Sequence, residues 1–252
     1  MAAPSLAWRV EETCLNAFPS LRQTIYRDWL LRYSDGFTRR ANSINPRSDR
    51  IEHLDAGIDA CAAMFRRQGL QPIFRIPEIA DPALDPALDC LGYAPEGLTL
   101  TLFADLADMQ SAPDAGAEIL ERPTREWLDA MGALQGRSAR QNATFERICG
   151  AIAFPVGFAG LREDGELTAL TIGAVHDGLL CFESVVTDER HRGRGHARRL
   201  LASLNAWAIA QGARGACLQV EATNEAGGAL YDRLGLRKTL YRYHYRRAPA
   251  GV

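Results

Sequence analysis

The sequence has very little lysine, no closely paired cysteines and no long apolar run. Lys238 is the single lysine among 29 lysines and arginines, which leaves almost no side-chain amine for Schiff-base chemistry. The six cysteines are scattered and most have apolar neighbours, so we expect small buried side chains in a reducing compartment and no metal site. No stretch is long enough for a membrane span, and the N-terminal segment carries Glu11 and Glu12, unlike a signal peptide. We therefore expect a soluble cytoplasmic protein without a membrane partner.

Acidic and basic residues almost cancel. The chain of 252 residues has 31 Asp and Glu against 29 Lys and Arg, a formal net charge of −2, so its composition indicates no nucleic-acid partner. The segment 237–247 is basic and contains tyrosines, a pattern that could indicate RNA binding. Such a pattern more commonly arises from a strand with one packed face and one solvated face. The five histidines lack the spacing of zinc ligands, and no G-x-S-x-G nucleophile motif is present.

The chain divides at a polar, small-residue segment, 104–117, which predicts a connection between residues 1–110 and residues 117–247. The second half alternates helical and strand periodicity, with turns at 163–165 and 177–178. We expect helices over 124–134 and 139–152, strands over 155–161, 167–175 and 179–186, a helix from Ala197, a strand over 216–221, a helix over 225–234 capped by Gly235, and a last strand over 239–247 with Tyr241, Tyr243 and Tyr245 on one face.

The first half repeats part of this pattern. Gln68-Gly69 and Gln211-Gly212 each follow an expected helix, and Leu91-Gly92 and Leu234-Gly235 each follow the next one at the same spacing. Two dipeptide matches can arise by chance, but the shared order of elements favours a duplicated helix–strand–helix–strand unit.

A glycine-rich run, R-G-R-G-H-A over residues 192–197, lies between an expected strand and an expected helix. Backbone N–H groups at the start of a helix suit an anionic phosphate, and glycines allow a close approach. The nucleoside-triphosphate loop motif is absent, and Arg198 occupies the position where a dinucleotide fingerprint needs Gly or Ala. Taken alone, such a run is more often a tight turn with surface arginines.

The context of this run resembles the GNAT acetyltransferases. Residues 192–197 fit R-x-x-G-x-[GA], the pyrophosphate loop of that superfamily. Downstream, Asn224, Tyr231 and the L-G-L run at 234–236 resemble its N-x(5)-L-Y-x-x-L-G-F segment, with Leu236 in place of Phe. The segment 29–43, W-L-L-R-Y-S-D-G-F-T-R-R-A-N-S, is similar to one in a bacterial GNAT subgroup with an N-terminal GNAT-like half.

The resemblance implies an α/β fold of tandem GNAT-like halves, each a mixed, mostly antiparallel sheet flanked by helices. Residues 1–110 would be a degenerate half with a structural or substrate-shaping role, and residues 117–247 a complete catalytic domain. It also implies one cosubstrate, acetyl-CoA, bound where the strand over 179–186 splays from the strand over 216–221.

The same resemblance assigns roles to individual residues. Amides of the strand after Glu183 would bind the pantetheine arm and polarise the thioester, and the Tyr231 hydroxyl would protonate the departing thiolate. Tyr231 is otherwise explained as a packed aromatic on an amphipathic helix. The implied cofactor-binding residues are Val185, Val186, Thr187, Arg192, Gly193, Arg194, Gly195, His196, Ala197, Arg198 and Asn224.

The general base is open at this point. Relatives place a glutamate five residues before the asparagine, but Gln219 stands there in this sequence. Glu183, Glu221 or a water molecule would have to accept the proton, and we prefer Glu183 because it lies on the strand that lines the site. The pair Gly227-Gly228 lowers the helix propensity of the segment before Tyr231.

The first half lacks the features that bind a cosubstrate. The repeat spacing aligns Gly193 with Arg50, Gly195 with Glu52 and Tyr231 with Leu88. We therefore expect one acetyl-CoA site per chain. Asn42, Ser43 and Asn45 could line an acceptor pocket, but turn capping explains them more simply.

The sequence thus predicts an acetyl-CoA-dependent N-acetyltransferase that moves an acetyl group to a primary amine of a small molecule or peptide by direct transfer. The alternative is a catalytically weak acyl-CoA-binding regulatory module. Amino acids, polyamines, aminoglycosides and protein N-termini are all possible acceptors, and the oligomeric state is open.

Overall fold

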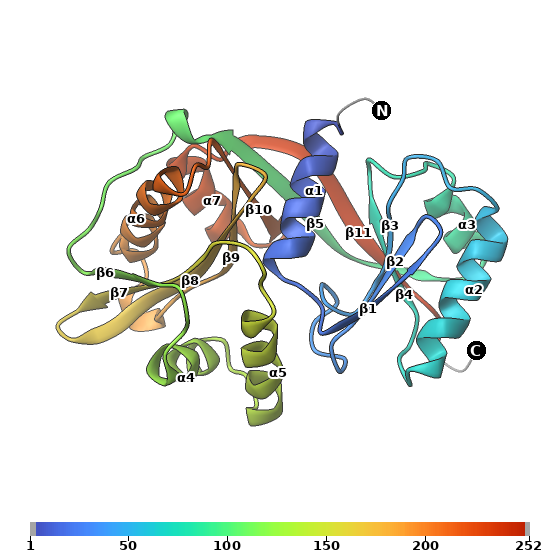
Figure 1. Ribbon diagram of the computed structural model, residues 1–252, viewed down its shortest axis with the longest axis horizontal. Helices are drawn as coiled ribbons and strands as arrows, with labels where there is room; N and C mark the ends of the chain where they lie inside the picture. The colour runs from blue at the N-terminus through green and yellow to red at the C-terminus, as the bar shows by residue number, and fades with distance from the viewer. Residues whose placement is uncertain (1–3, 250–252) are drawn as a thin grey trace. The chain divides into compact units, whose positions relative to one another are not determined.

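The computed structural model describes residues 4–249 (Figure 1). Its α-helices are α1 Leu6–Ala17, α2 Leu54–Arg67, α3 Leu84–Cys90, α4 Arg125–Leu134, α5 Ala139–Gly150, α6 His196–Ala210 and α7 Glu225–Leu234. Its strands are β1 Arg22–Tyr26, β2 Trp29–Tyr33, β3 Ile44–Pro46, β4 Ile73–Pro77, β5 Ala94–Asp105, β6 Ala117–Leu120, β7 Val156–Glu163, β8 Glu166–His176, β9 Leu179–Thr187, β10 Gly215–Glu221 and β11 Lys238–Arg247. Short 3-10 turns, η1 Leu106–Asp108 and η2 Glu189–His191, complete the list. No helix within residues 4–249 has the length and apolarity needed to cross a membrane.

The chain forms two compact units that interleave along the sequence. Unit 1 contains the residues up to Pro19, Thr101–Val220 and Asn224–Leu240, and unit 2 contains Ser20–Leu100, Glu221–Thr223 and the residues from Tyr241 onward. The units therefore differ from the contiguous halves 1–110 and 117–247 expected from the sequence. The physical reason is strand pairing: β11 pairs antiparallel with β4, from Tyr243 opposite Pro77 to Arg247 opposite Ile73.

Unit 1 holds a mixed sheet in the order β10-β9-β8-β7-β6. Neighbouring strands from β6 to β9 are antiparallel, whereas β10 lies parallel to β9. Asp164-Gly165 and Asp177-Gly178 connect the hairpins with both residues at positive φ, as tight hairpin turns require. These turns match the sequence expectation and fix the registers of β8 and β9.

Helices cover both faces of the unit 1 sheet (Figure 1). On one face, α6 packs so closely that a Cβ at Gly173 would lie 2.6 Å from the Leu204 side chain. On the other, Phe145 of α5 lies between Phe18 at the end of α1 and Trp127 of α4, with ring centroids 6.3 and 6.5 Å away. The first helix of the chain therefore belongs to the core of unit 1.

Unit 2 holds strands in the order β1-β2-β3-β4-β11, with α2 and α3 contributing to its core. Phe74 of β4 meets Trp29 edge-on, with the ring centroids 5.6 Å apart. Tyr243 and Tyr245 are buried in the same core, as the alternation of the last strand predicts. The sheets of both units are mixed and mostly antiparallel and are flanked by helices, which confirms the expected fold class.

The repeated dipeptides end corresponding helices in the same way. Gly69 and Gly212 have positive φ, and the next amide in each case bonds back to the helix, Leu70 N to Phe65 O and Ala213 N to Ala208 O. This is a left-handed helix ending, for which glycine has no steric cost. The two helices that the repeat spacing aligns therefore end with the same backbone conformation.

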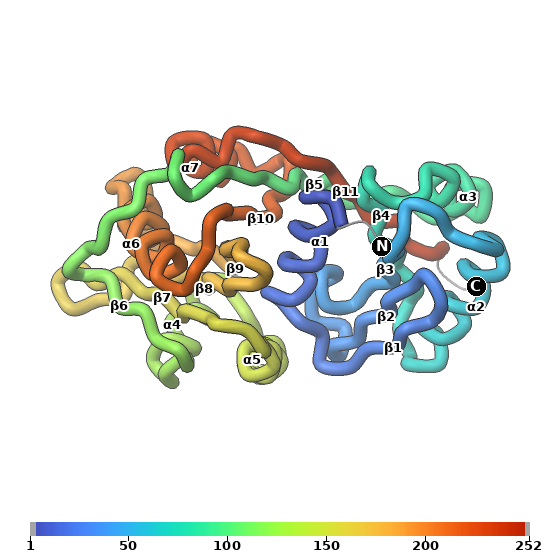
Figure 2. Tube along the Cα trace, turned by 45° about the horizontal axis from the view of Figure 1, so that its top comes forward, coloured from blue at the N-terminus to red at the C-terminus, as the bar shows by residue number. Residues whose placement is uncertain are grey.

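The connecting segment 104–117 is packed against α6 (Figure 2). The amide of Ala112 donates to Ala202 O at 3.2 Å, and Asn205 donates its side-chain N–H to Gln110 O at 2.8 Å. The segment is therefore a fixed part of unit 1, although its composition is that of a loose linker. Small side chains in this segment allow its backbone to approach α6 closely enough for these hydrogen bonds.

Candidate active site

The pairing of β9 with β10 stops partway along β9. It runs in parallel from Leu179 opposite Gly215 to Phe182 opposite Leu218, while β9 continues to Thr187. The last part of β9 is thus outside this pairing, which is the splay that the sequence resemblance implies. Val185, Val186 and Thr187 occupy that part of the strand and are half-buried.

A bulge redirects β9 where the splay begins. Leu170 of β8 lies opposite Val186 and Ile172 lies opposite Glu183, so two residues of β9 face one of β8. Ser184 takes φ 54°, a left-handed conformation that is costly for residues with a side chain. Bulges of this kind re-aim backbone groups beside active sites. Sequence reasoning missed Ser184, and only its polar side chain within an apolar strand marks the position.

The glycine-rich loop opens toward space that the protein leaves empty. Gly193 and Gly195 have φ of 76° and 82°, and a Cβ built on either would meet no atom within 4 Å. Gly195 is also the N-cap of α6 and supplies no side chain to bond the first-turn amides. Close backbone approach by a ligand is therefore possible at both glycines, and the helix amides face that approach.

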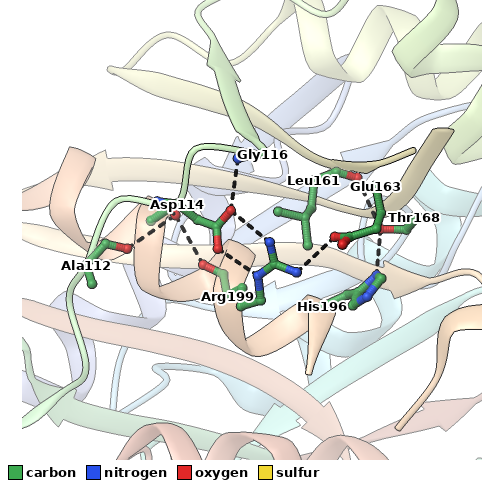
Figure 3. A network of polar contacts seen from close by, with 9 residues as sticks. Ala112, Asp114, Gly116, Leu161, Glu163, Thr168, His196 and Arg199 are labelled. Carbon is green, nitrogen blue, oxygen red and sulfur yellow. Dashed lines mark hydrogen bonds and ion pairs between the residues drawn. The ribbon is translucent and has the colours of Figure 1, made fainter. Parts of the chain in front are cut away.

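Two polar anchors fix the first turn of α6 (Figure 3). His196 Nδ1 lies 2.8 Å from Thr168 Oγ1, and desolvation lowers the pKa of this buried imidazole. Arg199 bonds Asp114 at 2.6 and 3.0 Å and Glu163 at 2.9 Å. Hydrogen bonds from Arg199 lower the pKa of Asp114. The His196 side chain is thus turned into the protein, and its backbone amide is what remains for a cofactor.

The arginines of the loop lie at the surface. Arg192, Arg194 and Arg198 are exposed, and Arg192 Nη1 is 3.2 Å from Glu189. Just before them, Asp188 accepts hydrogen bonds from Arg190, which lower the pKa of its carboxyl to about 2. The loop therefore offers exposed positive charge beside the backbone groups at the start of α6. Ala197, half-buried in the first turn, adds only its backbone.

Asn224 begins α7 as its N-cap. Its Oδ1 accepts a hydrogen bond from the Gly227 amide at 2.9 Å, and a Cβ at Gly227 would lie 2.8 Å from Asn224 Nδ2. A side chain at position 227 would therefore have to displace the Asn224 side chain that caps the helix. The side-chain oxygen of Asn224 caps the helix, and its Nδ2 group could donate a hydrogen bond to a ligand.

Tyr231 and Glu183, the expected acid and base, are both buried in unit 1. Tyr231 lies on α7 with 8% of its surface exposed, and Glu183 lies at the bulge of β9 with 2% exposed. The Glu183 carboxylate is 3.9 Å from the thiol of Cys181. By contrast, the alternative base Glu221 is largely exposed and its carboxylate bonds Arg39 at 2.7 Å. Arg39 thus engages the charge of Glu221, whereas Glu183 is buried beside the Cys181 thiol.

The corresponding loop of the first half satisfies its amides with carboxylates of the protein. Asp81 accepts from Ile51 N at 2.7 Å and from Ala83 N at 2.9 Å, and these bonds lower its pKa. Asp28 Oδ2 lies 3.4 Å from Glu52 N. Carboxylates of the protein therefore accept hydrogen bonds from the amides of this loop.

The side chain of Asn42 forms hydrogen bonds within a turn of unit 2. Its Oδ1 accepts from the amides of Ser34 and Gly36, and its Nδ2 donates to the carbonyls of Phe37 and Thr38 at 2.7 and 2.9 Å. The side chain has no capacity left for an acceptor, which agrees with the turn-capping interpretation. Nearby, Ser43 and Asn45 bond each other and the backbone.

Known proteins that resemble this chain over nearly its whole length are described as acetyltransferases. A family profile described as "Probable histone acetyltransferase Rv0428c C-terminal" matches residues 7–246. The "Uncharacterized N-acetyltransferase YobR" of Bacillus subtilis (strain 168) is 27% identical over 242 residues, covering 94% of this chain and 97% of that protein.

Solved structures share the fold. A GCN5-related N-acetyltransferase from Kribbella flavida aligns with a TM-score of 0.72 at 19% identity, covering 99% of this chain and 98% of that one. A tandem GNAT protein from the clavulanic acid biosynthesis pathway aligns with a TM-score of 0.66 at 16% identity, covering 89% and 79%. Because the family profile matches residues 7–246, the chain belongs to the family described as "Probable histone acetyltransferase Rv0428c C-terminal". It has the GNAT fold and is an acyltransferase of the N-acetyltransferase type.

Proposed function

We propose that this enzyme transfers the acetyl group of acetyl-CoA directly to a primary amine, using a single site in unit 1. The observation that carries the proposal is the end of β9: its pairing with β10 stops at Phe182, a bulge follows at Ser184, and the strand leads into an open glycine loop at the start of α6. Such an arrangement provides backbone donors for a thioester and for a pyrophosphate within one short stretch of chain.

The residues present fit the cosubstrate. The pyrophosphate would bind the amides from Gly193 to Arg198, because both glycines face empty space and the helix start carries about half a positive charge. The exposed side chains of Arg192, Arg194 and Arg198 add attraction for phosphate oxygens. Asn224 would donate through Nδ2.

The thioester would lie along the end of β9. Amides of Val185, Val186 and Thr187 would hold the pantetheine arm and stabilise the negative charge that develops on the thioester oxygen. Anchoring the following helix through His196 and Arg199 keeps these donors in place before the cosubstrate binds. Donors fixed in advance need no rearrangement during the reaction.

Two buried side chains would move the protons. Glu183, directly or through water, would take a proton from the amine, whose nitrogen then attacks the thioester carbon. The carbon–sulfur bond breaks as the amide forms, and Tyr231 would give its proton to the departing thiolate. We prefer Glu183 to Glu221 because Arg39 already engages the Glu221 carboxylate.

The first half of the repeat would have a structural or substrate-shaping role. Asp81 and Asp28 fill its anion position, and Leu88 stands in the core where the other copy has Tyr231. The acceptor would be a small molecule or a peptide with a free amine. The family description names histone, so lysine-containing basic peptides belong among the acceptors to be tested.

The test is acetyl transfer with a panel of amines. Release of the free CoA thiol is followed in the presence of amino acids, polyamines, aminoglycosides and basic peptides. The acetylated products are identified by mass spectrometry. Stoichiometric CoA release and acetyl-amine formation are expected for at least one class. Tight acetyl-CoA binding without transfer to any amine would instead indicate the regulatory acyl-CoA-binding module.

A further inference from the structure

Three cysteines that are far apart in the sequence meet in the core of unit 1. Cys14 comes from α1, Cys181 from β9 and Cys217 from β10, and their exposed fractions are 2%, 0% and 0%. The sulfur of Cys181 lies 3.7 Å from that of Cys14, and the sulfurs of Cys14 and Cys217 are 3.9 Å apart. All three sulfurs lie within 4.8 Å of one another. The sequence predicted isolated buried thiols here, so this grouping is a product of the fold.

The spacing of the sulfurs equals that of a metal–thiolate site. Zinc–sulfur bonds of about 2.3 Å in a tetrahedron place neighbouring sulfurs about 3.8 Å apart. The two sulfur distances given above lie on either side of this value. A cation could therefore enter the triangle with small rotations of the three side chains.

Glu183 lies beside this group but is not part of it. Its Oε1 is 3.9 Å from the Cys181 sulfur, and the set of ligand atoms that all lie within 4.8 Å of one another consists of the three sulfurs. Thiolate sulfurs suit Zn²⁺, whereas Ca²⁺ and Mg²⁺ require mostly oxygen ligands. Within residues 4–249, the three thiols form the group of His, Cys, Asp and Glu side chains with ligand atoms close enough to share an ion.

We propose that Cys14, Cys181 and Cys217 bind one Zn²⁺ per chain through their three sulfurs. Each thiol that binds as a thiolate releases its proton to the solvent, and no electron is transferred. The ion would join α1 to β9 and β10. Because it binds the folded arrangement and not the separated elements, it would stabilise unit 1 in proportion to its occupancy.

The experiment uses the full chain, freed of metal with a chelator and kept reduced with a phosphine. Zn²⁺ is titrated against a chromophoric chelator, and Co²⁺ is used as a spectroscopic substitute that reports thiolate ligation through its charge-transfer absorption. We expect saturation at one ion per chain, the thiolate–cobalt band, and a rise in the thermal unfolding midpoint. Absence of saturable binding to the wild-type chain overturns the proposal without any variant being made.

Variants identify the ligands. Cys14→Ala, Cys181→Ala and Cys217→Ala should each weaken Zn²⁺ binding at least about a hundredfold. The matched controls are Cys61→Ala and Cys149→Ala, which change buried cysteines outside the group and should leave the affinity unchanged. Equal losses in the controls would contradict the assignment, as would full affinity in the three cysteine variants.

The binding measurement is independent of acetyl transfer. A protein that binds Zn²⁺ but acetylates no amine would support this site and contradict the proposed function. A protein that acetylates amines but binds no Zn²⁺ would do the reverse. The two proposals therefore fail separately.

Discussion

His196 Nδ1 lies 2.8 Å from Thr168 Oγ1, which ties the first residue of α6 to β8 (Figure 3). The imidazole is only 5% exposed, and desolvation lowers its pKa from the usual value of 6.5. The folded protein thus holds His196 neutral. The same contact keeps the start of α6 fixed beneath the glycine-rich loop.

This contact predicts a pH dependence of stability. Because the pKa of His196 is lower in the folded state than in the unfolded state, unfolding takes up a proton as the pH falls below about 6.5. The contribution of His196 to the free energy of unfolding is therefore fully present above that pH and is lost as the solution becomes more acidic. Denaturant unfolding between pH 5 and 7.5 should show a steeper loss for the wild type than for His196→Gln. Parallel curves for the two proteins would contradict the assignment.

Gly195→Val should abolish tight acetyl-CoA binding. The side chain would enter the empty space beside the loop and would remove two or three charge-assisted backbone bonds, each worth roughly 1.5–3 kcal/mol, so affinity should fall by orders of magnitude. Calorimetric titration measures the change. Gly212→Val is the matched control at the other end of α6, since Gly212 also has positive φ and empty space around its Cα.

Both valine variants carry a strained backbone, which costs roughly 1–3 kcal/mol of stability. The control should show this loss of stability and yet bind acetyl-CoA normally. A folded Gly195→Val protein with wild-type affinity would show that the pyrophosphate binds elsewhere.

Tyr231→Phe should separate binding from catalysis. The ring still fills its place on α7, and only the hydroxyl group is removed. General acid assistance is worth roughly 10²–10⁴-fold, so turnover should fall by about that factor while CoA affinity and thermal stability change little. Tyr33→Phe, at a buried tyrosine of unit 2, is the control for loss of a hydroxyl. Full activity in Tyr231→Phe would remove this residue from the mechanism.

The two candidate bases can be told apart by isosteric amides. Glu183→Gln should lower kcat by roughly 10²–10⁴-fold, because the amide accepts no proton. Glu221→Gln removes only an exposed ion pair with Arg39, worth roughly 0–1 kcal/mol of stability, and should affect kcat far less. Rates are compared at saturating acetyl-CoA across pH. A larger loss in Glu221→Gln would reverse the assignment.

Acetyl-CoA should bind with a stoichiometry of one per chain. In the first half, Asp81 and Asp28 already accept hydrogen bonds from the loop amides and would repel a pyrophosphate. Calorimetry with the wild-type chain gives the number directly. Two equivalent sites would mean that the degenerate copy binds despite these carboxylates.

The sequence by itself determined the local features of this protein. Gly69, Gly212 and Gly235 end helices, and Asp177-Gly178 makes a hairpin turn, because each needs a positive φ that depends on a few neighbouring residues. The glycine loop before α6 was predictable for the same reason. Apolar periodicity placed the helices and strands of the second half to within about two residues, except for β6, which it did not indicate.

Only the tertiary structure decided which distant segments meet. β11 pairs with β4, and α1 joins the core of unit 1, since both depend on side-chain packing over long sequence separations. The bulge at Ser184 arises from the register between β8 and β9, which neither strand specifies alone. The meeting of Cys14, Cys181 and Cys217 has the same origin: three thiols on three elements come together only when those elements pack into one core.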